Sequence, residues 1–160
     1  MSAVERVVDL ERAAAAAAKA RAAGNSVVLA NGCFDLLHVG HVRYLEGARA
    51  LGELLIVGVN SDASVRQLKG KGRPLLGERS RARLVAALAA VDLVVVFGEP
   101  DVRGLLRALR PQVHAKGTDY RIETVPERDT ALEVGARVAI AGDPKDHSTR
   151  DLLARMRGLA

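Results

Sequence analysis

The sequence is poor in aromatic residues and contains a single cysteine, and each scarcity argues against particular kinds of binding site. Among its 160 residues are two tyrosines, two phenylalanines and no tryptophan. Because proteins that bind single-stranded nucleic acid stack the bases on aromatic rings, this composition gives little support to that kind of binding. The lone cysteine, Cys33, cannot form a disulfide within the chain, and it cannot supply a thiolate cluster for a metal ion.

Long apolar runs are missing as well. No stretch approaches the roughly 20 apolar residues that a membrane-spanning helix needs. The first residues also lack the basic-then-apolar order of a signal peptide. We therefore expect a cytoplasmic protein without a membrane partner.

The length and the charge set further bounds. A chain of 160 residues suits one domain, so we predict a single domain over residues 1–160, with residues 1–24 as a helical lead-in. The formal net charge is +5, but acidic residues are interspersed with the basic ones. Polyanionic small substrates explain local basic clusters as well as a nucleic acid does, and we expect no nucleic-acid partner.

Short apolar runs alternate with helical patterns along the chain. The runs predict strands at residues 26–30, 54–60, 91–97, 112–115 and 137–141. The patterns between and after them predict helices, among them residues 39–51, 78–90 and 150–157. This order is typical of an α/β fold, a doubly wound, Rossmann-like parallel sheet of five strands. Ligands in such sheets bind beyond the carboxyl ends of the strands.

Residues 31–41 carry the chemistry, and they read NGCFDLLHVGH. They follow a predicted strand and lead into a predicted helix, whose N-terminus is a ready site for an anion. His38 and His41 are three residues apart and therefore share one face of the first helical turn. Gly40 between them lets a phosphate approach the backbone. Two histidines beside a helix N-terminus suit charge that develops on a phosphorus centre.

The basic loop after the second predicted strand and the residue Cys33 each allow more than one interpretation. Residues 69–74, KGKGRP, form either a solvated turn or a mobile clamp on a triphosphate, in which basic side chains neutralise phosphate charge and glycines let the loop close. Cys33 is either a reactive thiol or a small residue that the motif tolerates, and we favour the second.

The sequence resembles the nucleotidyltransferase superfamily with its H-x-G-H signature, in the cytidylyltransferase-like branch. The resemblance is strongest to the bacterial D-glycero-β-D-manno-heptose 1-phosphate adenylyltransferases and covers about residues 28–153. Besides residues 31–41, the segments that carry it are 58–65 (GVNSDASV), 68–70 (LKG), 73–74 (RP), 87–92 (ALAAVD), 109–111 (LRP) and 116–120 (KGTDY).

The resemblance implies a reaction and a set of site residues. AMP would pass from ATP to a sugar 1-phosphate, expected to be D-glycero-D-manno-heptose 1-phosphate, with Mg²⁺ as cofactor. Pyrophosphate would be released and an ADP-sugar formed for lipopolysaccharide. A homodimer is expected. His38, His41 and Lys69 would be catalytic. Residues expected to bind the nucleotide are Asn31, Gly32, Cys33, Phe34, Gly40, Lys71, Arg81, Lys116, Gly117, Ser148, Thr149 and Arg150.

Asp35 and Asp119 would bind hydroxyl groups of the sugar or the ribose, and the alternative for both is local loop capping. The resemblance names no protein ligand for a metal.

Two departures from the family pattern affect the choice of substrate. Ser148-Thr149-Arg150 replaces the usual Ser-Thr-Thr, and residues 143–146, DPKD, stand where cytidylyltransferases carry Arg-Thr-Glu-Gly. The second departure argues against CTP and glycerol 3-phosphate. The alternatives are a cytidylyltransferase for glycerol 3-phosphate or another alcohol phosphate, a module that senses ATP without turnover, and a nucleic-acid binder.

Overall fold

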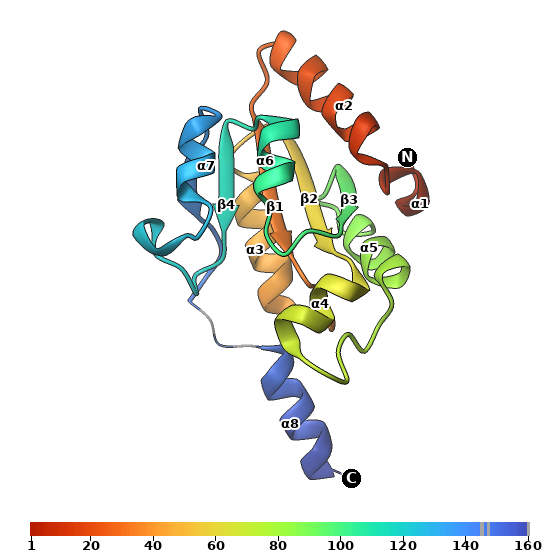
Figure 1. Ribbon diagram of the computed structural model, residues 1–160. Helices are drawn as coiled ribbons and strands as arrows, with labels where there is room; N and C mark the ends of the chain where they lie inside the picture. The colour runs from red at the N-terminus through yellow and green to blue at the C-terminus, as the bar shows by residue number, and fades with distance from the viewer. Residues whose placement is uncertain (145, 147, 160) are drawn as a thin grey trace.

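The structure is a computed structural model that describes residues 1–144, 146 and 148–159. Within these residues, five parallel strands form one sheet in the order β3-β2-β1-β4-β5 (Figure 1). The strands are β1 (Val27–Gly32), β2 (Leu54–Asn60), β3 (Leu93–Phe97), β4 (Val113–Lys116) and β5 (Arg137–Ile140). The prediction of a doubly wound, five-stranded α/β fold is therefore confirmed.

Helices connect the strands and cover both faces of the sheet. They are α1 (Ala3–Arg6), α2 (Leu10–Ala22), α3 (Val39–Arg49), α4 (Asp62–Lys69), α5 (Glu78–Ala86), α6 (Arg103–Leu109), α7 (Arg128–Glu133), α8 (Thr149–Leu159) and the 3₁₀ turn η1 (Ile122–Thr124). Among the described residues, no helix combines the length and the apolar character that crossing a membrane requires.

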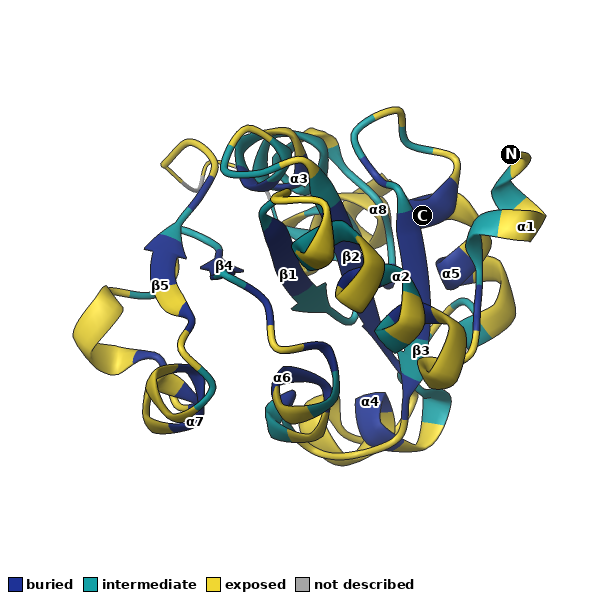
Figure 2. Ribbon diagram, turned by 90° about the horizontal axis from the view of Figure 1, so that it is seen from above, coloured by how far each residue is buried: buried dark blue, intermediate teal, exposed yellow. Residues whose placement is uncertain are grey.

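Two hydrophobic layers hold the sheet, because neighbouring residues of a strand point to opposite faces. Along β1, Val27 and Leu29 pack against α2, α6 and α7, whereas Val28 and Ala30 pack against α3 and α5. Figure 2 shows the strands buried between helices whose outer faces are exposed. This burial on both faces explains why strands such as residues 54–60 read as unbroken apolar runs.

Polar side chains cap several of the helices. The side chain of Asp9 caps α2, that of Ser61 caps α4, and the hydroxyl of Ser148 accepts a hydrogen bond from the backbone N–H of Asp151 in the first turn of α8. The predicted helix over residues 78–90 ends early, at Ala86, because a turn follows that directs the chain into β3. The predicted helical lead-in over residues 1–24 consists of two helices, α1 and α2, separated by residues 7–9. Helix α7 and the turn η1 were not predicted, since six and three residues are too few to show a helical period.

Candidate functional site

A cavity of about 1180 Å³ opens at the carboxyl ends of the strands. The chain crosses the sheet from β1 to β2 on one side and returns to β4 on the other, so the ends of β1 and β4 flank the point where the strand order reverses. The loop after β1, the loop after β4 and the start of α8 all line the cavity. The three segments therefore meet at one cavity, at the end of the sheet where a ligand was expected.

Most of the residues predicted for the site lie in this cavity. Those that line it are Asn31, Gly32, Cys33, Phe34, Asp35, His38, Gly40, His41, Lys69, Lys116, Gly117, Asp119, Ser148, Thr149 and Arg150. Two predicted residues, Lys71 and Arg81, are not part of its lining.

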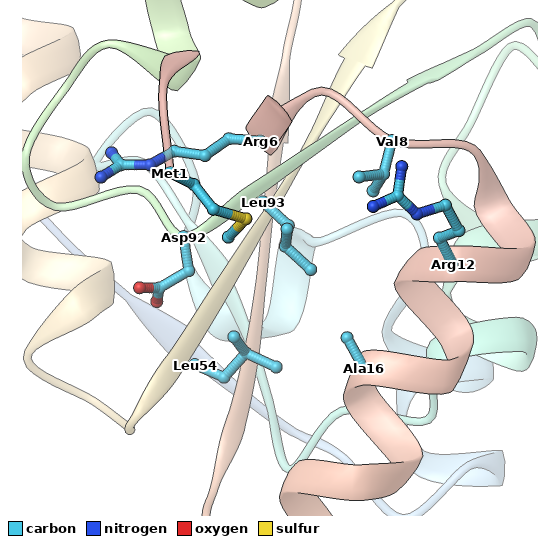
Figure 3. Close-up of a pocket in the computed structure, with 8 residues that line it drawn as sticks. All are labelled: Met1, Arg6, Val8, Arg12, Ala16, Leu54, Asp92 and Leu93. Carbon is cyan, nitrogen blue, oxygen red and sulfur yellow. The ribbon is translucent and has the colours of Figure 1, made fainter. Parts of the chain in front are cut away.

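A smaller hollow of about 420 Å³ lies at the opposite end of the sheet, where β2 and β3 begin (Figure 3). It is lined by Met1, Arg6, Val8, Arg12, Ala16, Leu54, Asp92 and Leu93. None of these residues was predicted for the site. Since parallel sheets bind their ligands at the other end, the larger cavity is the candidate site.

The two histidines of the motif are fixed by the backbone of α3. His38 is the N-cap of the helix, and its Nδ1 accepts a hydrogen bond from Gly40 N–H at 3.1 Å. Nδ1 of His41 accepts from His38 N–H at 3.3 Å, and the two rings stack with their centroids 3.9 Å apart. Because Nδ1 is an acceptor in both rings, the neutral form of each carries its proton on Nε2. Both rings are thus set as Nε2–H donors at a helix N-terminus.

The ring of Phe34 packs the loop tightly before the helix. Phe34 is buried, adopts a positive φ of 49°, and lies with its ring centroid 5.2 Å from that of His41. A Cβ atom on Gly32 would come within 3.1 Å of the Phe34 ring. Glycine at position 32 therefore allows Phe34 to support the His41 ring from below the loop.

Two residues that the sequence analysis missed hold Asn31. The Tyr44 hydroxyl accepts from Asn31 N–H at 3.4 Å and donates to the Ala115 carbonyl at 2.7 Å. Nε2 of His114 lies 3.1 Å from Oδ1 of Asn31. Burial, assisted by the charge of Lys116, lowers the pKa of His114 to about 3, so this ring is neutral at pH 7. Neither residue stood out in the sequence, because contacts between distant segments bring them to Asn31. The pairing of β1 with β4 brings His114 there, and the packing of α3 against β1 brings Tyr44.

Asp35 serves the loop that was predicted to clamp a triphosphate. Its carboxylate accepts from Arg73 Nε at 2.6 Å, from Leu75 N–H at 2.8 Å and from Leu76 N–H at 3.0 Å, and the residue is 2 % exposed. Burial would raise the pKa of Asp35, but these hydrogen bonds outweigh it and the pKa is lowered. Of the two roles considered for Asp35, the structure supports loop capping rather than binding of a substrate hydroxyl.

Arg81 requires a correction, because its side chain is completely enclosed. The guanidinium donates to the carbonyls of Leu76, Cys33 and Asn60 at 2.7 to 2.8 Å and to Oδ1 of Asp62 at 2.8 Å. Its donors are therefore directed at the protein itself. Arg81 joins the loops after β1 and β2 to the segment before α5, and it does not face the nucleotide as the resemblance implied.

The basic loop places its two lysines differently. Both lysines are exposed, but Lys69, at the end of α4, lines the cavity, whereas Lys71 lies outside its lining. Gly70 and Gly72 on either side of Lys71 adopt φ values of 93° and 88°, which glycine accommodates without strain. The structure thus separates a lysine at the cavity from one in a glycine-flanked turn.

The loop after β4 forms another wall of the cavity. Lys116 is only 6 % exposed, with Nζ 4.5 Å from the Tyr120 ring centroid and 4.0 Å from Oε2 of Glu127. Burial lowers the pKa of Lys116, although the carboxylates of Glu127 and Asp119 oppose this effect.

The segment before α8 closes the cavity on its far side. The Thr149 hydroxyl donates to the Leu36 carbonyl at 3.3 Å and so ties the start of α8 to the motif loop. Arg43, which the sequence analysis missed, lines the cavity and lies 3.5 Å from the carboxylates of Asp143 and Asp146. Arg150 is exposed and also lines the cavity. Of the residues at 143–146 that depart from the family pattern, Lys145 lies outside the described residues.

The described residues give little support to catalysis by the Cys33 thiolate or to a metal ion held by protein side chains. Burial raises the pKa of the Cys33 thiol, which disfavours the nucleophilic thiolate and agrees with a tolerated small residue. Within the described residues, no group of three or more His, Cys, Asp or Glu side chains is placed to hold a metal ion.

Proteins of known sequence are similar to this chain over most of its length. The bifunctional protein HldE of Magnetococcus marinus is 50 % identical over 139 residues, which are 87 % of this chain and 28 % of the relative. That of Caulobacter sp. strain K31 is 48 % identical over 158 residues, or 99 % of this chain and 32 % of the relative. The chain thus spans about a third or less of the length of these relatives.

Solved structures share the fold. A lipopolysaccharide core biosynthesis protein from Thermoplasma volcanium superposes with a TM-score of 0.65 at 26 % identity, over 76 % of this chain and 100 % of its own. Pantoate-β-alanine ligase from Francisella tularensis gives a TM-score of 0.68 at 12 % identity, over 92 % of this chain and 72 % of its own, which is a likeness of fold alone. Residues 29–151, the greater part of the chain, match the cytidylyltransferase-like family. The chain therefore belongs to the cytidylyltransferase-like family.

Proposed function

We propose that this chain is a nucleotidyltransferase that moves AMP from ATP to a sugar 1-phosphate, releasing pyrophosphate and forming an ADP-sugar. The observation that carries the proposal is the pair of stacked histidines, each set as an Nε2–H donor at the N-terminus of α3 inside a large cavity. A module that only senses ATP would not need two oriented donors at one phosphorus centre.

The reaction is a direct transfer at the α-phosphorus of ATP. An oxygen of the acceptor's phosphate attacks this atom and forms the new P–O bond. The bond from the α-phosphorus to the bridging oxygen breaks, and its electron pair leaves with pyrophosphate. The acceptor phosphate is already deprotonated at neutral pH, so the chain needs no general base. His38 and His41 donate through Nε2 to oxygens on which negative charge increases in the transition state.

Cations of the cavity offset the charge of the triphosphate. Lys69 at the end of α4 and Arg150 in the first turn of α8 both line the cavity, and α8 adds backbone N–H groups at its first turn. We propose Mg²⁺ as the cofactor. Since Mg²⁺ is commonly held by substrate phosphates and water with few protein carboxylates, it would enter with ATP, where it would shield the phosphate charge. We name no protein ligand for it.

For the acceptor we propose D-glycero-D-manno-heptose 1-phosphate. In support, the relatives at 48–50 % identity are named HldE, and the Thermoplasma neighbour is described as a lipopolysaccharide core biosynthesis protein. The competing acceptors are glycerol 3-phosphate and other alcohol phosphates with CTP as donor. The homodimer and the cytoplasmic location stay predictions, and light scattering of the purified chain tests the first.

The deciding experiment measures pyrophosphate release from ATP, CTP, GTP and UTP, each with a panel of sugar 1-phosphates and with glycerol 3-phosphate. We expect turnover with ATP and the heptose 1-phosphate and its loss in His41→Ala. Turnover with CTP and glycerol 3-phosphate would establish the competing activity. ATP binding without pyrophosphate release in any combination would contradict an enzymatic role.

A further inference from the structure

One carboxylate oxygen in the wall of the cavity has no hydrogen-bond partner among the described residues. It is Oε2 of Glu127, a residue that lines the cavity and is only 5 % exposed. Glu127 precedes α7 as its N-cap residue, yet its side chain makes no capping hydrogen bond. Since a buried acceptor without a partner destabilises the folded chain, its presence calls for a group that donates to it.

The nearest cation is placed too far away to be that donor. Nζ of Lys116 lies 4.0 Å from Oε2 of Glu127, beyond hydrogen-bond distance. A single oxygen atom could nevertheless lie about 2.8 Å from both atoms, accepting from Lys116 and donating to Glu127. Of the groups on a nucleotide or a phosphorylated sugar, only a hydroxyl does both with one oxygen.

We propose that Lys116 and Glu127 form a subsite for a hydroxyl group of a sugar ring, either the ribose of the nucleotide or the sugar of the acceptor. This inference rests on the function proposed above and assigns a part of the substrate to these two residues. It also assigns to Glu127 the binding of a sugar hydroxyl, which the resemblance had implied for Asp35. The carboxylate of Asp35 is already occupied by Arg73 and two backbone N–H groups.

The charges in this wall argue against a phosphate as the bound group. A carboxylate 4.0 Å from the lysine offsets the attraction of its ammonium for an anion, and a second carboxylate, Asp119, lines the same wall. The Tyr120 ring, 4.5 Å from Nζ, holds the ammonium in place and leaves a partly apolar surface beside it. A neutral, hydroxyl-bearing ring suits such a surface better than a phosphate does.

The test compares the parent with Glu127→Gln, which keeps the size of the side chain and removes its charge. Binding of ATP, 2′-deoxy-ATP and 3′-deoxy-ATP is measured by calorimetry without acceptor, and the KM of the acceptor is measured separately. Glu133→Gln is the matched control, because it makes the same change on α7 at an exposed residue outside the cavity lining. Glu127→Asp, which keeps the charge but shortens the side chain, guards against a folding effect of the first variant.

If the hydroxyl belongs to the ribose, ATP binds Glu127→Gln roughly ten- to a hundredfold more weakly, the difference expected for a hydrogen bond to a charged group. The deoxy analogue that lacks this hydroxyl then binds the parent and the variant with equal affinity. If the hydroxyl belongs to the acceptor, ATP binding is unchanged and the acceptor KM rises by a similar factor. Either result supports the subsite and identifies its source.

Two results would overturn the inference. Unchanged binding and KM in Glu127→Gln and Glu127→Asp would mean that the gap holds a water molecule only. An equal loss for ATP and both deoxy analogues, together with a lower melting temperature, would mean a purely structural role. If the parent turns over ATP and Glu127→Gln behaves identically, only this inference is contradicted. If the parent releases no pyrophosphate, the proposed function itself is contradicted.

Discussion

Replacing Arg81 with methionine should lower the free energy of unfolding of the protein rather than weaken its binding of ATP directly. The guanidinium is fully buried and donates to three backbone carbonyls and to the carboxylate of Asp62. Methionine fills much of the same volume but offers no donor, so Arg81→Met leaves these acceptors without their partner. The three carbonyls belong to Cys33 in the loop after β1, to Asn60 at the end of β2 and to Leu76 in the segment before α5.

The size of the effect follows from these contacts. Each buried acceptor left without a donor costs about 1–3 kcal/mol, and breaking a buried ion pair costs about 3–5 kcal/mol. The costs do not add fully, because Asp62 and the partly buried carbonyls can turn toward water. We therefore expect a loss of about 3–5 kcal/mol in unfolding free energy. For a chain of this length that corresponds to a drop of roughly 6–20 °C in the melting temperature.

Thermal and urea unfolding of Arg81→Met measure this loss, with Arg79→Met as the control. Arg79 lies on the same helix, α5, and is exposed, so its replacement should change the melting temperature by only about 1–2 °C. A variant Arg81→Met that melts with the parent but binds ATP much more weakly would refute the structural role. It would restore Arg81 as a nucleotide contact.

Four further outcomes are expected. His41→Ala should lower kcat by a factor on the order of 10²–10³ with a smaller change in the KM of ATP, whereas a rise in KM alone would make His41 a ground-state binder. Lys69→Ala should weaken ATP binding and slow turnover more than Lys71→Ala, because only Lys69 lines the cavity, and equal effects would contradict this placement. The pKa of His114 is lowered to about 3 from an ordinary value of 6.5, so its contribution to stability is complete above pH 6.5 and is lost as the pH falls toward 3. The parent should therefore lose unfolding free energy between pH 7 and pH 5, and in His114→Gln this loss should be smaller by about 2 kcal/mol, as measured by urea unfolding at both pH values. Arg150→Thr should raise the KM of either ATP or the acceptor at fixed Mg²⁺, and unchanged kinetics would leave Arg150 as a surface residue.

The sequence by itself determined the architecture and the position of the motif. The apolar run of residues 54–60 became β2 without a change of bounds. Ser61 or Asp62 could have capped the helix after it, and the structure shows Ser61 as the cap. The motif histidines, three residues apart, came to stack on each other at the start of α3, with His38 as its N-cap and His41 in its first turn. These features depend on neighbours within a few residues, so local propensity and periodicity were enough to predict them.

The tertiary structure decided which polar side chains face the cavity and which serve the protein itself. Asp35 and Arg81 carry the charges of a binding site in the sequence, yet their partners Arg73 and Cys33 lie 38 and 48 positions away and enclose them. Glu127 was not singled out in the sequence, and only the fold placed it beside Lys116. Burial and the pairing of charges arise from contacts between distant segments, and the linear order of residues carries no record of which segments will meet.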